Sequence, residues 1–159
     1  MPQVQDLLRF ANQKINTSDH LTYITYPTVN ENKLMISIVE NIFVGMTAGM
    51  DALLLYERTF KRVPMYADDF RAKVELLKSH AADRYNLDRK YIIALEDLRM
   101  LIEAHKKSTT EISHREKFVI FSDTYQMKAL TIENVKSYLA LAKSFMDKVN
   151  KVLANAGRY

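Results

Sequence analysis

The 159-residue chain contains no cysteine and only three glycines and three prolines. The absence of cysteine excludes disulfide frameworks, cysteine-ligated zinc, iron–sulfur clusters and thiol nucleophiles. So few glycines and prolines argue against an all-β fold with many tight turns and favour long helices. The three glycines also lack the spacing of the glycine-rich loops that bind dinucleotides or nucleoside triphosphates. The sequence therefore predicts a mainly helical protein without thiol chemistry.

Apolar residues make up 48% of the chain and charged residues 26%, as in ordinary globular domains. A chain of this length buries roughly 70% of the surface that it exposes when unfolded, so we expect one domain over residues 1–159. The longest stretch without Asp, Glu, Lys or Arg has 11 residues, whereas a membrane-spanning helix needs about 20 apolar residues. Asp6 and Arg9 interrupt the start, so no signal peptide is expected. We expect no membrane association and a cytoplasmic location.

The formal net charge of +4 is unevenly distributed. Residues 1–57 hold three basic and six acidic residues, for a net charge of −3. Residues 58–159 hold the other 20 basic and 13 acidic residues, for a net charge of +7. A basic segment of this kind is compatible with an anionic partner such as RNA. The alternative interpretation is an ordinary lysine-rich surface in contact with water.

Apolar residues recur at intervals of three and four, the spacing of one helix face, in five segments. The predicted helices span residues 3–26, 31–62, 67–85 and 89–107, and a last helix begins at Thr131. Residues 16–19 are a weak point in the first helix, and Pro27 is expected to end it, because a residue before proline disfavours helical geometry. Asn30 is a candidate N-cap for the second helix.

The segment 31–62 is the most apolar of the five and is expected to form the centre of the bundle. Its main row consists of Met35, Val39, Ile42, Met46, Gly49, Leu53, Tyr56 and Phe60. Further apolar residues lie on its other faces, so other helices must surround it. As a continuous helix it would be about 48 Å long, and we expect its excess apolar surface to face a second copy of the chain. Gly45 and Gly49, one turn apart, favour close packing within the chain.

Two short segments before the last helix have strand character. Residues 117–122 are rich in β-branched and aromatic side chains, and residues 125–130 alternate between polar and apolar. The residues between them, 122–124, favour a turn, so we predict a β-hairpin that packs on the helices or on a partner. Glu111 to His114 is expected to lie in the preceding loop. The predicted fold class is therefore all-α, an up–down bundle of about five helices with a small β-hairpin before the last helix.

Few side chains have the spacing of a reactive site. Glu40 and Asp51 lie three helical turns apart, about 16 Å, which is too far for a catalytic carboxylate pair. Each is expected to have a structural partner on a neighbouring helix. Glu111 and His114 are the one Glu–His pair with the spacing of di-iron bundles, and they lie in the predicted loop. We expect no metal and no cofactor.

Arg99 precedes His105 with five residues between them, and the most basic surface segment follows. A histidine can act as general acid or base, and an arginine can hold a scissile phosphate. A continuous helix would direct the two side chains roughly 120° apart, so they converge only if the helix ends early or across a dimer axis. The structural alternative is that Arg99 pairs with Glu96 or Glu103, and that His105 stabilises the helix C-terminus.

In this arginine–histidine spacing and in its order of helices, the chain resembles the HEPN family of all-α proteins. Members are helical bundles of about this size and are commonly dimeric. In active members, the arginine and histidine perform metal-independent RNA cleavage in a cleft between two subunits. The resemblance implies that Arg99 would bind phosphate and that His105 would be the acid/base.

Two functional hypotheses follow, and the sequence leaves open whether the protein is an enzyme. The first is a HEPN-like interaction module that is homodimeric, non-catalytic and associated with a nucleic acid or a protein partner. The second is a metal-independent ribonuclease in which Arg99 and His105 are catalytic. In that case the residues expected to attract RNA are Lys106, Lys107, Arg115 and Lys117. A purely structural subunit of a larger assembly is a third class.

Overall fold

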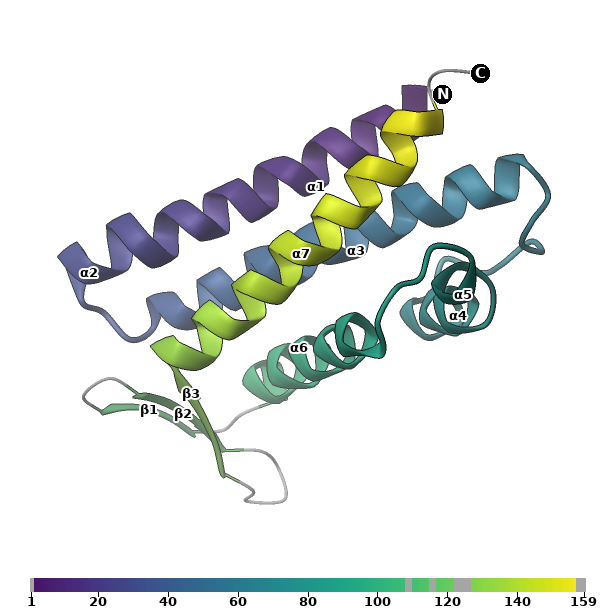
Figure 1. Ribbon diagram of the computed structural model, residues 1–159. Helices are drawn as coiled ribbons and strands as arrows, with labels where there is room; N and C mark the ends of the chain where they lie inside the picture. The colour runs from purple at the N-terminus through teal and green to yellow at the C-terminus, as the bar shows by residue number, and fades with distance from the viewer. Residues whose placement is uncertain (1, 108–109, 115–116, 122–126, 157–159) are drawn as a thin grey trace.

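The structure is a computed structural model that describes residues 2–107, 110–114, 117–121 and 127–156, with side chains for 2–107 and 130–155. Arg115 and the predicted turn at 122–124 lie outside the described residues. The described chain is a bundle of five helical rods with a small sheet at one end (Figure 1). The start of the first rod and the end of the last rod lie at the same end of the bundle, far from the sheet.

The first rod is longer than predicted. It consists of α1 (Pro2–His20), a π-helical turn (Leu21–Thr25) and α2 (Tyr26–Val29). The predicted weak point at 16–19 is wrong, because α1 runs through it, and Pro27 does not end the rod. In the wider π turn, the Tyr26 N–H bonds to the Leu21 carbonyl, five residues back. This change of hydrogen-bond register lets Pro27 occupy the second position of a new α-helical segment, where a proline is tolerated.

Asn30 ends the first rod and does not begin the next helix, so the predicted N-cap is wrong. Its backbone is left-handed, with φ 52° and ψ 42°, and its N–H bonds to the Tyr26 carbonyl at 2.7 Å. Asparagine tolerates this conformation better than most residues, which suits it to a helix C-terminus. The central helix, α3 (Leu34–Thr59), begins four residues later.

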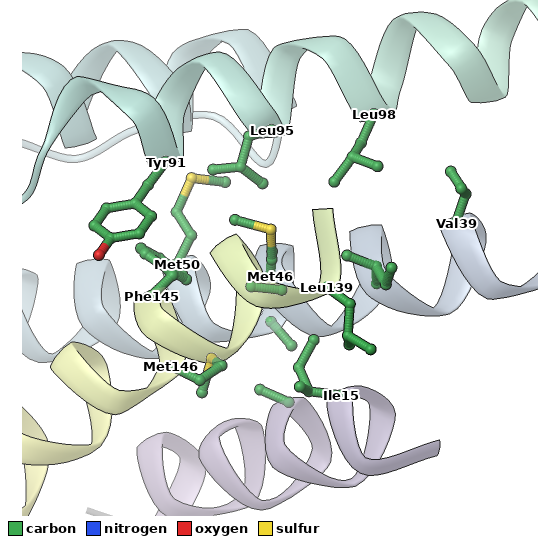
Figure 2. Close-up of a cluster of buried hydrophobic side chains, with 14 of the residues drawn as sticks. Ile15, Val39, Met46, Met50, Tyr91, Leu95, Leu98, Leu139, Phe145 and Met146 are labelled. Carbon is green, nitrogen blue, oxygen red and sulfur yellow. The ribbon is translucent and has the colours of Figure 1, made fainter. Parts of the chain in front are cut away.

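The helix α3 is unbroken and occupies the centre of the bundle, between α1, α6 and α7 (Figure 1). The predicted row from Met35 to Leu53 is buried. Figure 2 shows Met46 and Met50 of α3 between Leu95 of α6 and Phe145 of α7. Neighbours from its own chain therefore cover most of this apolar helix.

Among the described helices, α3 is long and apolar enough to cross a membrane by length and composition. Its most apolar window of 18 residues is 61% buried inside the bundle. The environment of α3 in this structure is accordingly that of a core helix.

The other rods begin at side-chain caps. The third rod comprises α4 (Phe70–Leu76), a π-helical turn (Leu77–Ala81) and α5 (Ala82–Arg84), and Asp69 caps it by accepting a bond from the Ala72 N–H at 3.1 Å. Asp88 caps α6 (Arg89–Lys107) by accepting from the Lys90 N–H at 2.9 Å. The predicted cap at Thr131 is confirmed, since its hydroxyl accepts from the Asn134 N–H at 3.2 Å in the first turn of α7 (Ile132–Ala156).

The sheet has three antiparallel strands in the order β1 (Thr110–His114), β2 (Lys117–Phe121) and β3 (Met127–Thr131). Val119 of β2 is paired with Ile112 on one side and Ala129 on the other. The prediction that Glu111 to His114 forms a loop is wrong, because this segment is most of β1. Ile112 is the single apolar residue of β1, so the segment lacks the alternation of polar and apolar residues that predicts a strand. The pairing of β1 with β2 determines its conformation.

The two glycines of α3 lie where side chains of α1 and α7 pack against this helix. A Cβ atom at Gly45 would lie 2.6 Å from the end of the Ile15 side chain and 3.2 Å from the Lys14 Cβ. At Gly49 it would lie 2.6 Å from the Met146 sulfur. The glycines therefore allow α1 and α7 to approach α3 within one chain.

Alanine at these two positions is expected to have unequal effects. Gly45→Ala should lower the free energy of unfolding by about 1 kcal/mol, because α1 must shift to relieve the contact with the rigid Lys14 Cβ. Gly49→Ala should be nearly neutral, because the flexible Met146 side chain can move and alanine favours the helix. Urea unfolding of both variants measures the difference. Equal losses would contradict this packing.

Candidate functional site

The candidate arginine is held in place by its own chain. Arg99 lies on α6, and its Nε donates a hydrogen bond to Oε1 of Glu103, one turn further along, at 2.9 Å. Its guanidinium lies over the ring of Phe70 on α4, 4.6 Å from the ring centre. The hydrogen bond from Arg99 lowers the pKa of Glu103 below its ordinary value. Glu96, the other predicted partner, pairs with Lys78 at 2.9 Å.

Arg99 borders a cavity of about 380 Å³ between α3, α4 and α6. Three basic and three acidic side chains line it: Lys73, Arg99, Lys106, Asp51, Asp68 and Glu103. The formal charges of this lining cancel, whereas a cleft that draws in a polyanion carries a net positive charge.

Lys73 connects two of these acids. Its ammonium lies 2.9 Å from an oxygen of Asp51 on α3 and 2.5 Å from Asp68. The predicted structural partner of Asp51 is thereby confirmed. Burial raises the pKa of Asp51 above its ordinary value, and the Lys73 ammonium opposes that shift. Lys73 also lowers the pKa of the exposed Asp68. The three residues join α3 to the start of α4, which is a structural role.

His105 lies in the last turn of α6, and the helix runs unbroken through Arg99 and His105. The two side chains therefore leave the helix roughly 120° apart. His105 is not among the described residues that line the cavity at Arg99, whereas its neighbour Lys106 is. Within one chain, the predicted catalytic pair is not brought together.

The predicted RNA-attracting residues are only partly placed. Lys106 and Lys107 are exposed at the end of α6. Lys117 begins β2, and the structure describes its backbone. Arg115 lies outside the described residues. Lys106 is thus the one of the four that shares a described cavity with Arg99.

The sequence analysis did not identify a buried acid in the last turn of α3. Glu57 is fully buried and accepts a hydrogen bond from the Tyr85 hydroxyl. Arg84 Nε lies 3.4 Å from one of its oxygens, and Arg62 lies 3.7 Å from the other. Spacing could have identified it, because Glu57 continues a buried row at intervals of three and four after Met50.

Among the described residues, no group of three or more His, Asp or Glu side chains is arranged to hold a metal ion. No protein-family model matches the chain, and neither does any curated protein. A functional conclusion therefore depends on the geometry of the residues themselves.

Proposed function

We propose that the chain is a HEPN-like helical interaction module that is homodimeric and has no catalytic activity. The supporting observation is the separation of Arg99 from His105 on one continuous helix. A phosphate bound by Arg99 would lie on a different side of α6 from the imidazole that must move a proton. General acid–base catalysis needs both groups within hydrogen-bond reach of one substrate.

The environment of Arg99 supports the same proposal. Glu103 and the ring of Phe70 already engage its guanidinium. An incoming phosphate must compete with the Glu103 carboxylate for the same cation, in a cavity whose lining has no net charge. Arg99 thus has the role of a structural residue that joins α6 to α4. The expected location of the module is the cytoplasm.

The second candidate function is the metal-independent ribonuclease, for which a partner copy must bring its His105 to Arg99. The observation that favours it is Lys106, which borders the same cavity as Arg99. In this case Lys107, Arg115 and Lys117 extend the basic surface beyond the cavity.

An RNA cleavage assay in EDTA separates the two functions. We expect no turnover of a mixed-sequence RNA by the purified chain, and the same background with Arg99→Ala and His105→Ala, because the two groups do not share a substrate position. Lys90→Ala is the matched control, since Lys90 is an exposed cation on α6 outside the described cavity at Arg99. Cleavage that both variants abolish and Lys90→Ala retains would establish the ribonuclease and overturn the proposal.

A further inference from the structure

One exposed face of α6 carries apolar and charged side chains in an ordered row. Ile93 is 53% exposed and Met100 is 54% exposed, seven residues further along the same helix. The row, which we call the α6 stripe, consists of Arg89, Ile93, Glu96, Met100 and Glu103, at intervals of four and three. Such spacing places all five on one face of the helix.

Two neighbouring hollows lie beside the α6 stripe. Two hollows of about 370 and 390 Å³ lie between α6 and the rod formed by α4 to α5. Lys78 and Glu96, which form an ion pair at 2.9 Å, border both hollows, so the two are neighbours along α6. A second helix laid along the stripe would have space on this side.

Other exposed apolar side chains of the described residues do not form such a row. Tyr23 has the ammonium groups of Lys136 and Lys143 over its ring, at 5.4 and 5.6 Å. Ile24 and Val29 are five residues apart along the first rod, which is not the interval of three or four that repeats along the α6 stripe. Within the described residues of α3, Val44 is the only large apolar side chain that is exposed. Little apolar surface of α3 is therefore left for a partner.

The α6 stripe is complementary to itself when two copies run antiparallel. Arg89 lies seven residues before Glu96, and Glu103 lies seven residues after it. A twofold axis near Glu96 thus places Arg89 opposite Glu103 of the second copy. The same register places Ile93, three residues before the axis, opposite Met100, four residues after it. A shift of one turn in either direction would lose both matches.

Glu96 itself is compatible with a position near the axis. Its carboxylate pairs with Lys78 of its own chain at 2.9 Å. The Lys78 ammonium would therefore reduce the electrostatic repulsion between the two Glu96 carboxylates at the axis. Closed homodimers commonly use such isologous contacts, in which one patch serves both subunits.

We propose that the α6 stripe pairs antiparallel with the same stripe of a second copy of this chain. The proposal rests on the homodimer of the proposed function and specifies its interface. In this register, Arg99 of one copy and His105 of the other lie 12 residues apart along the helix axis, roughly 18 Å. The dimer therefore forms no composite arginine–histidine cleft, in agreement with a non-catalytic module.

Sedimentation equilibrium of two matched variants tests the interface. Ile93→Asp should raise the dimer dissociation constant at least tenfold, because it places an unpaired carboxylate opposite Met100. Ile24→Asp should leave it unchanged, since Ile24 is 58% exposed and lies outside the stripe. Circular dichroism checks that both variants remain folded.

The absence of native cysteine allows a test of orientation. Glu96→Cys lies near the proposed axis and should give a covalent dimer on mild oxidation, whereas Met65→Cys, on the exposed Met65, should not. A dimer that Ile93→Asp leaves intact overturns the interface but keeps the homodimer. A dimer that Ile93→Asp weakens but Glu96→Cys does not cross-link overturns the antiparallel register. A wild-type monomer at all concentrations overturns both the interface and the homodimer.

Discussion

Phe145→Ala is expected to lower the free energy of unfolding by about 4 kcal/mol, the cost of removing a large aromatic side chain from a close-packed core. Phe145 is fully buried on α7, and its ring packs against Tyr91 of α6 with 5.7 Å between ring centres (Figure 2). It also lies against Gly49 of α3. The substitution therefore leaves a cavity where three helices meet.

Urea unfolding followed by circular dichroism measures this loss. Phe10→Ala is the matched control, because Phe10 is 43% exposed on α1 and should lose less than about 1 kcal/mol. Similar losses in the two variants would mean that α7 does not pack on α3 and α6 as described.

Tyr85→Phe is expected to have the second largest effect, a loss of about 2 kcal/mol. The Tyr85 hydroxyl donates to Glu57, whose side chain is fully buried. Removing the hydroxyl leaves a buried carboxylate oxygen with only the distant cation of Arg62, 3.7 Å away. Tyr66→Phe is the control, since the Tyr66 ring contacts Arg58 through its face, and phenylalanine keeps that contact.

The hydrogen bond between Tyr85 and Glu57 makes the free energy of unfolding depend on pH in the alkaline range. Burial, together with the hydrogen bond to Glu57, raises the pKa of Tyr85 above its ordinary value of 10.0. The folded chain therefore keeps this proton at a pH where the unfolded chain has released it. The stabilisation is fully present below about pH 10 and declines as the pH rises further. Wild type should lose more stability than Tyr85→Phe over that range, and parallel pH profiles would contradict this role of Tyr85.

Much of the helical architecture follows from local patterns. The buried row of α3 was predictable because residues three and four apart share a face, and a helix apolar on several faces needs neighbours on each. The start of α7 was predictable because the Thr131 side chain satisfies a backbone N–H that no carbonyl of the helix can reach.

The predictions fail where tertiary contacts or the hydrogen-bond register of the backbone determine the secondary structure. The π turn at Leu21–Thr25 has no residue signature, and without it Pro27 indicates the end of a helix. The strand β1 depends on pairing with β2, so its own sequence carries little information. Local rules describe each segment separately and cannot include these effects.

The candidate site likewise has features that could be predicted from the sequence and features that could not. The divergence of Arg99 and His105 follows from helix geometry once the helix is known to run through both. The contact of Arg99 with Phe70 could not be predicted, because it joins residues of two different helices. The burial of Glu57 had a signal in its spacing, although its charge argued for an exposed position.

Hydrogen exchange along α3 tests most directly whether this helix is enclosed by its own chain. We expect the slowest amide exchange between Leu34 and Thr59, because α1, α6 and α7 of the same chain cover α3. This protection should be unchanged in the Ile93→Asp variant at a concentration where sedimentation shows it to be monomeric. Protection of α3 that disappears on dissociation, while the other helices keep theirs, would show that a second copy completes this core and would contradict the structure described here.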